Sequence, residues 1–149
     1  MKIKIFILLI LLSCVNIVHA VELTEAGVLL RSYHFDRDKD YNEANYGLVL
    51  TIDKQYQLIG FKNSHYDATF AAGRKFYWEP TKHVELSIVI ALVYGYGLTD
   101  DFTVTDEDEA GGKTLLPWLL PTFTYKYNDF TINTHFLGSG LAWSIGYRL

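Results

Sequence analysis

The chain has 149 residues, of which 50% are apolar and 15% aromatic, and its formal net charge is −4. This length allows one domain, and the apolar fraction is too high for a disordered chain. Because 13 Lys and Arg stand against 17 Asp and Glu, the composition excludes a general nucleic-acid binder, and we expect no nucleic-acid partner. The apolar residues are unevenly distributed: residues 3–18 are almost entirely aliphatic, whereas those further along alternate with polar residues.

The aliphatic block has the features of an export signal. Lys2 and Lys4 flank its start, residues 5–12 are apolar, and Val18-His19-Ala20 fits the small-residue rule for cleavage. We therefore interpret residues 1–20 as a signal peptide and residues 21–149 as the mature domain. Alternatively, the tetrapeptide ending at Cys14 is a lipoprotein box, and the acylated cysteine becomes the mature N-terminus. Both interpretations predict an exported chain without a disulfide, because Cys14 is the only cysteine.

Beyond Ala20 no apolar run reaches the ~20 residues that a membrane helix needs. The sequence instead contains segments of alternating apolar and polar residues, each close to the ~9–11 residues of a membrane β-strand. We place eight such segments, at 25–35, 44–53, 56–64, 68–78, 83–96, 115–127, 130–137 and 141–149. Aromatic residues gather at their ends, as in the girdles of outer-membrane barrels. The pattern predicts an all-β fold, an eight-stranded antiparallel transmembrane β-barrel of the outer membrane.

The connections between the segments favour the same fold. Tight turns join the second segment to the third, the fourth to the fifth and the sixth to the seventh, whereas charged stretches at 36–43 and 97–114 form longer connections. With both termini in the periplasm, the tight turns lie inside and the long loops outside, as in bacterial barrels. Closure also removes every strand edge that lipid would otherwise contact. We expect a monomer in the cell outer membrane; the rival interpretation is a soluble periplasmic β-sandwich or lipocalin-like barrel.

Alternation in the fifth and sixth segments predicts a divided barrel interior, polar toward the periplasm and apolar in the outer half. The fifth segment would turn Tyr94 and Tyr96 toward lipid together with its aliphatic residues. An eight-stranded barrel has room inside for side chains or for one small ligand. The sequence is therefore compatible with a packed plug of side chains and equally with an acyl-chain lumen. The predicted lining residues of that lumen are Val89, Ala91, Val93, Gly95, Leu116, Trp118 and Leu120.

Two prolines lie in the predicted outer part of the sixth segment. Proline cannot donate to a sheet ladder and is normally confined to edges or bulges. Since a closed barrel has no edges, Pro117 and Pro121 predict a local gap in the wall, through which an acyl chain would enter sideways from the outer leaflet. Alternatively, Pro117 simply starts the strand, which leaves only Pro121 to explain.

Candidate catalytic side chains come together at the predicted outer rim. The first segment ends in Ser32-Tyr33-His34-Phe35 and the third in Phe61-Lys62-Asn63-Ser64-His65. A serine hydroxyl needs an adjacent base to attack a carbonyl, and histidine is the usual one. Rim histidines and serines also occur on loops without a catalytic role, so both interpretations stay open. Neither the histidines nor the acidic stretch 99–109 has the spacing of a metal site, so we expect no metal and no cofactor.

Three short stretches resemble one family. Tyr41-Asn42-Glu43-Ala44-Asn45-Tyr46-Gly47, which follows His34, is similar to a His…Tyr-Asn-Glu-x-x-x-Gly region of the PagP-type lipid A palmitoyltransferases. Phe61-Lys62-Asn63-Ser64 resembles the Phe-Lys-Asp-Ser of that family, and Leu116-Pro117-Trp118-Leu119-Leu120-Pro121 resembles its Leu-Pro-x-Leu-Leu-Pro. The stretches occur in the same order, and the resemblance runs from about residue 33 to the C-terminus.

The resemblance implies an outer-membrane barrel that moves a palmitoyl chain from a phospholipid to lipid A, with phospholipid and lipopolysaccharide as its partners. It also implies catalytic roles at the outer rim: His34 as the base, Ser64 as the nucleophile or hydroxyl partner, and Asn63 at the position where the family has aspartate. An amide cannot stabilise a charged imidazole as a carboxylate does. The alternative is therefore a non-enzymatic surface barrel, for example a phage or prophage protein with an exclusion or structural role, that kept the fold and lost the chemistry.

Overall fold

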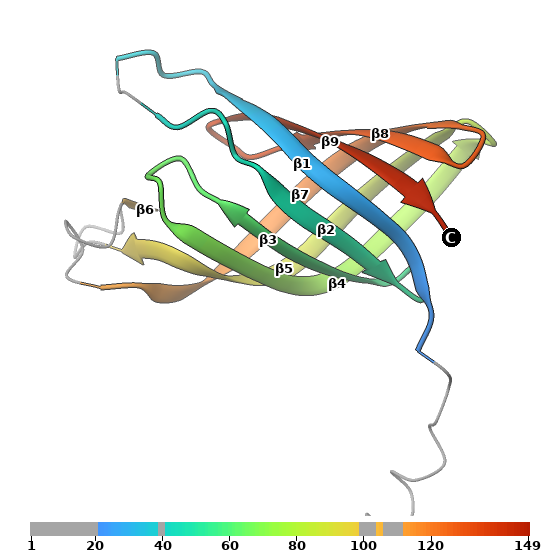
Figure 1. Cartoon of the computed structure of the whole chain (residues 1–149), viewed down its shortest axis with the longest axis horizontal. Coiled ribbons are helices and arrows are strands. Elements are labelled where there is room, and N and C mark those ends of the chain that lie inside the picture. Colours follow the sequence, from blue (N-terminus) through green and yellow to red (C-terminus); the bar gives the residue numbers. More distant parts are fainter. Residues whose placement is uncertain (1–20, 39–40, 99–103, 106–111) are drawn as a thin grey trace, which may run out of the picture.

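The computed structural model describes residues 21–38, 41–98, 104–105 and 112–149, which form strands and their connections (Figure 1). In chain order the strands are β1 (Leu23–His34), β2 (Gly47–Ile52), β3 (Tyr56–Lys62), β4 (Ala68–Thr81), β5 (Val84–Leu98), β6 (Val104–Thr105), β7 (Thr114–Tyr127), β8 (Phe130–Phe136) and β9 (Gly140–Arg148). In this part of the chain, no helix has the length and apolar character needed to cross a membrane.

The sheet closes on itself. β1 pairs with β2 on one side and with β9 on the other, and antiparallel ladders continue the circle through β3, β4, β5, β7 and β8. The predicted eight-stranded antiparallel barrel is therefore confirmed. The short β6 is additional: it pairs with the end of β5 at Gly97↔Thr105 and Leu98↔Val104, within a stretch that we expected to be a loop. Two residues are too few for an alternation pattern, so the sequence held no signal for it.

The period of two along each strand separates the side chains into an outward and an inward set. β5 shows this most clearly, because alternate residues from Leu86 to Tyr94 are exposed and those between them are buried. β9 alternates in the same way, with Ala142 and Ser144 inside and Ile145 outside. The outward face is apolar around most of the barrel. The residue types at this exposed surface are therefore those that usually form the buried core of a protein.

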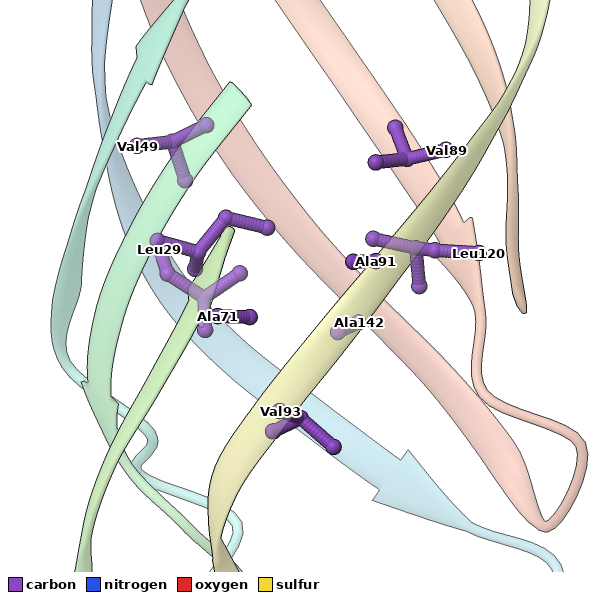
Figure 2. Close-up of a cluster of buried hydrophobic side chains, with 9 residues drawn as sticks. Leu29, Val49, Ala71, Val89, Ala91, Val93, Leu120 and Ala142 are labelled. Atoms are coloured by element: carbon purple, nitrogen blue, oxygen red, sulfur yellow. The ribbon is translucent and has the colours of Figure 1, made fainter. Parts of the chain in front are cut away.

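The apolar core lies inside the outer half of the barrel. It is a cluster of nine buried side chains, Leu29, Val49, Ile59, Ala71, Val89, Ala91, Val93, Leu120 and Ala142. Figure 2 shows them pointing into the interior from opposite walls, with Leu29, Val49 and Ala71 on one side and Val89, Ala91 and Leu120 on the other. Several members are alanine or valine, and such small side chains leave the centre of the barrel incompletely filled.

Polar and charged side chains line the inner half, around a polar hollow of about 660 Å³ that lies toward the inner turns. Glu85 of β5 pairs with Lys75 of β4 at 2.5 Å and with Lys126 of β7 at 2.7 Å, and all three are buried. Lys126 is also 2.5 Å from the half-exposed Glu79. A buried charge is tolerated only when it is paired and hydrogen-bonded. These contacts meet that condition, because each buried charge in the inner half has a partner of opposite sign. The predicted division into a polar inner and an apolar outer interior is thus present.

Both ends of the described chain lie at the end of the barrel that carries the tight turns (Figure 1). The C-terminal ends of β1 and β5 and the short β6 lie at the opposite end, beside the apolar half of the interior. We call these the inner and the outer end.

Candidate functional site

A cavity of about 460 Å³ occupies the outer half of the barrel. Four of the predicted lumen residues line it: Val93 of β5, and Leu116, Trp118 and Leu120 of β7. Val89 and Ala91 are buried in the adjoining apolar cluster. The remaining apolar lining comes from β1, β2, β3 and β9, for which no lining residues were predicted, and includes Leu29, Val49, Ile59, Phe61 and Ala142. The interior is therefore not a fully packed plug, because its apolar half contains a cavity.

Gly95, which was also predicted to line the lumen, has a different role. Its φ is +133°, and β5 shifts register between Tyr94 and Tyr96. A Cβ atom at Gly95 would lie 2.4 Å from Oγ1 of Thr69, so only glycine fits. The bulge also reverses the alternation that follows it. Tyr96 consequently lines the cavity, and its predicted orientation toward lipid is wrong.

The floor of the cavity is polar. His135 of β8 reaches it from the inner side, with Nδ1 2.9 Å from Thr122 Oγ1 and Nε2 2.9 Å from Ser144 Oγ. Asn133 continues this network one layer further in, because its Nδ2 donates to Ser144 Oγ at 3.1 Å. Both ring nitrogens of His135 are thus occupied, and the histidine closes the apolar space from below as a satisfied interior residue.

Four rings form a row along the outer rim of the cavity. His34 stacks on Tyr41 with ring centroids 4.2 Å apart, and the edge contacts Tyr41–His65 and His65–Tyr96 follow at 5.9 Å and 6.3 Å. All four residues line the cavity, together with Ser32, Asn45 and Ser64. They come from the end of β1, the β1–β2 connection, the turn after β3 and the end of β5.

The β1–β2 connection is held by asparagine side chains instead of a ladder. Asn45 Nδ2 donates to the carbonyl oxygens of Asn42 and Lys62, at 3.1 and 3.0 Å, and Asn42 Nδ2 donates to the carbonyl oxygen of Asn63 at 3.0 Å. β2 consequently begins at Gly47, so the predicted strand start at residue 44 is wrong. A Cβ atom at Gly47 would lie 2.4 Å from the carbonyl oxygen of Gly60, and only glycine permits this approach.

Glu43 ties the same connection to β1. Its carboxylate accepts hydrogen bonds from Arg37 and, at 3.2 Å, from Arg31, and it lies 3.4 Å from the backbone nitrogen of His34. The hydrogen bond from Arg37 is the main cause that holds the pKa of the Glu43 carboxyl below its ordinary value; partial burial acts in the opposite direction. The carboxylate is therefore ionised at neutral pH.

The predicted base and nucleophile do not face each other. His34 Nε2 is 3.5 Å from Ser32 Oγ, and Nδ1 is buried without a hydrogen-bond partner among the described residues. Ser32 Oγ donates to Asn45 Oδ1. Ser64 hydrogen-bonds to the phenol of Tyr96 instead of to His34. The structure thus places His34 and Ser64 on one cavity but in two separate hydrogen-bonded pairs.

Asn63 has no exposed surface and organises the turn after β3. Its Nδ2 donates to Thr69 Oγ1 at 3.0 Å and to the carbonyl oxygen of Gly95 at 2.9 Å. Its Oδ1 accepts from the backbone nitrogens of His65 and Asp67, at 2.8 and 3.0 Å. Every polar atom of this amide is used within the turn, so Asn63 supports the rim and does not orient a histidine.

The barrel wall lacks one ladder where the prolines lie. β7 pairs with β8 only from Tyr127↔Phe130 to Thr122↔His135, whereas its pairing with β5 continues to Thr114. Pro117 and Pro121 belong to this one-sided stretch of β7. The alternative that Pro117 starts the strand is wrong, because β7 begins at Thr114. Since proline has no N–H to donate, it fits a strand that has an open side.

Comparison with models of known protein families and with curated proteins gives no match. Within the described parts of the chain, no three or more His, Cys, Asp or Glu side chains gather into a group that could hold a metal ion. The fold and the site therefore define a structural class: a closed eight-stranded antiparallel barrel with an apolar cavity at its outer end and a rim of histidine, tyrosine and serine side chains.

We predict that Asn63→Asp destabilises the barrel by about 1–3 kcal/mol, because a carboxylate cannot donate to the Gly95 carbonyl and leaves it buried without a partner. Unfolding by urea in detergent micelles measures the loss. Asn128→Asp is the matched control, since Asn128 is exposed at a tight turn with positive φ, where aspartate is also tolerated. An unchanged stability of Asn63→Asp would contradict the structural role of this amide.

Proposed function

We propose that this protein is an outer-membrane barrel that binds an acyl chain of a membrane lipid in its outer cavity. The observation that carries the proposal is the cavity itself. Its volume of about 460 Å³ falls in the ~300–1,000 Å³ range of small-molecule sites, and its mostly apolar walls and few converging polar groups are typical of them. The stretch of β7 without a β8 partner is the proposed lateral entrance, because lipid would reach the cavity there without crossing a ladder.

The outward surface supports the membrane location. Val28, Leu48 and Ile145 are cross-strand neighbours, and each is 42–50% exposed. Aromatic side chains are exposed toward both ends, with Tyr56, Tyr77, Trp78, Tyr125 and Tyr147 at the inner end and Tyr33, Phe35, Tyr46 and Tyr66 at the outer end. An apolar band between two aromatic girdles is the surface of an outer-membrane barrel, and it would be a severe aggregation hazard in water.

Acyl transfer from a phospholipid to lipid A is the second candidate, and the rim favours it. His34, with an unpartnered Nδ1, lines the same cavity as the hydroxyls of Ser32 and Ser64. A chain bound in the cavity would place its ester beside these groups, and the motifs that resemble the palmitoyltransferases build this rim. The reaction requires that His34 accept a proton from the attacking hydroxyl, so with Ser64 in that role a side-chain movement must first bring the two together. A non-enzymatic barrel would bind the chain without this step.

We predict that Val28→Arg costs about 2–4 kcal/mol in phospholipid vesicles, because it buries a guanidinium near the middle of the apolar band. Reversible folding into vesicles measures the loss, and Tyr46→Arg at the outer rim, the matched control, should cost ~0–1 kcal/mol. If the protein folds without lipid and Val28→Arg has an effect within ~0.5 kcal/mol, it is a soluble barrel.

We predict that Ala142→Phe abolishes acyl-chain binding, because Ala142 lines the cavity and a phenyl ring would fill it. Trp118 reports occupancy: in a Trp78→Phe, Trp143→Phe background, a brominated alkane bound in the cavity quenches its fluorescence. Ala72→Phe, on the outward face of β4, is the matched control and should bind as the parent does. Equal quenching in the folded Ala142→Phe variant would show that the alkane lies outside the cavity.

For acyl transfer, we predict that expression in a Gram-negative host lacking its own palmitoyltransferase adds one palmitoyl group to lipid A. Mass spectrometry of lipid A measures this gain, and His34→Ala and Ser64→Ala should each remove it. Tyr94→Phe, which alters an outward tyrosine, should retain it. An unmodified lipid A from cells with folded barrel in the outer-membrane fraction would exclude acyl transfer and favour the non-enzymatic barrel.

A further inference from the structure

Tyr96 is a cavity residue that the mechanism suggested by the family resemblance does not use. Its inward orientation depends on the bulge at Gly95, which turns β5 so that Tyr94 faces outward and Tyr96 faces the cavity. The edge contact with His65 fixes the plane of its ring. A backbone distortion that requires a glycine and redirects one polar ring into the cavity indicates a specific role for that ring.

The partner of Tyr96 is equally well positioned. Ser64 is more than nine-tenths buried, and its backbone carbonyl accepts the N–H of Asn42 at 2.9 Å. The preceding residue, Asn63, is bonded to the carbonyl of Gly95, so the turn that carries Ser64 and the bulge that carries Tyr96 are directly joined. The two hydroxyls thus form a hydrogen-bonded pair at the polar end of the cavity, and both sides of the pair are held by backbone.

One of the two hydroxyl hydrogens of this pair is not used in a hydrogen bond. Two hydroxyls carry two hydrogens, and the bond between them uses one. Within the described part of the chain, neither hydroxyl has a second hydrogen-bond partner. A partly buried donor without an acceptor is unfavourable, so this polar end of the cavity is complementary to a ligand that has an acceptor oxygen at one end and an apolar chain behind it.

We propose that the Ser64–Tyr96 pair binds the carbonyl oxygen of the acyl ester whose chain fills the cavity, with Tyr96 as the positioning residue. The inference rests on the proposed acyl-chain binding. A neutral ester fits better than a free carboxylate, because the spare hydrogen satisfies one carbonyl lone pair, whereas a buried charge would need compensation that the apolar walls do not supply. Tyr96 is then what distinguishes an acyl ester from a hydrocarbon of the same length.

The test compares two quenchers of Trp118 fluorescence in the Trp78→Phe, Trp143→Phe background: a brominated alkane and the methyl ester of a brominated fatty acid with the same chain length. The parent should bind the ester more tightly. Tyr96→Phe, which removes only the hydroxyl, should weaken ester binding roughly fivefold to tenfold, the equivalent of one ordinary hydrogen bond, and leave the alkane unchanged. Ser64→Ala should show the same selective loss, and Tyr94→Phe is the matched control without effect.

The outcomes separate this inference from the proposed function. If the parent binds neither compound, acyl-chain binding fails and the inference fails with it. If the parent binds both with equal affinity, the cavity binds acyl chains but the hydroxyl pair does not recognise the ester group. This result overturns only the inference. If Tyr96→Phe weakens both compounds equally, Tyr96 merely shapes the wall, which also overturns it.

Discussion

Closure of the sheet is the constraint on which the rest of this structure depends. Because the ladder returns from β9 to β1, alternate side chains of every strand face a narrow interior, and the others face outward. Eight strands leave little room inside, so the size of each inward side chain decides whether the centre is filled. Polar and charged side chains line the inner half and leave a polar hollow there, whereas alanine and valine positions leave an apolar cavity in the outer half.

The features on which the proposed function rests occur where the closed ladder is interrupted. The part of β7 that precedes Thr122 has no β8 partner, and this one-sided segment of the wall contains both prolines. The β1–β2 ladder ends at Leu29↔Gly47, and a loop held by asparagines completes the rim there. The bulge at Gly95 turns Tyr96 inward. Each interruption removes backbone pairing, and the proposed function uses the result as an entrance, a rim or a ligand contact.

The rim also changes the interpretation of the family resemblance. The stretches that resemble the lipid A palmitoyltransferases do converge on one cavity, which is what a shared site requires. His34 and Ser64, however, contact Ser32 and Tyr96 instead of each other, and Asn63 is used entirely by the turn. Binding of an acyl chain follows more directly from this geometry than catalysis does, because binding needs only the cavity and a donor, whereas transfer needs a rearrangement of the rim.

The sequence by itself determined the number of strands in the barrel, their approximate positions and the polar and apolar halves of the interior, because a period of two and short turns are local signals. It also identified Val93, Leu116, Trp118 and Leu120 as interior residues. Only the tertiary structure decided that Tyr96 faces the cavity, that Asn63 is structural and that Leu29, Val49 and Ile59 complete the lining. Those outcomes depend on a bulge, on side-chain hydrogen bonds between residues far apart in the sequence and on the register at which the barrel closes. None of these produces a periodic pattern in the amino-acid sequence.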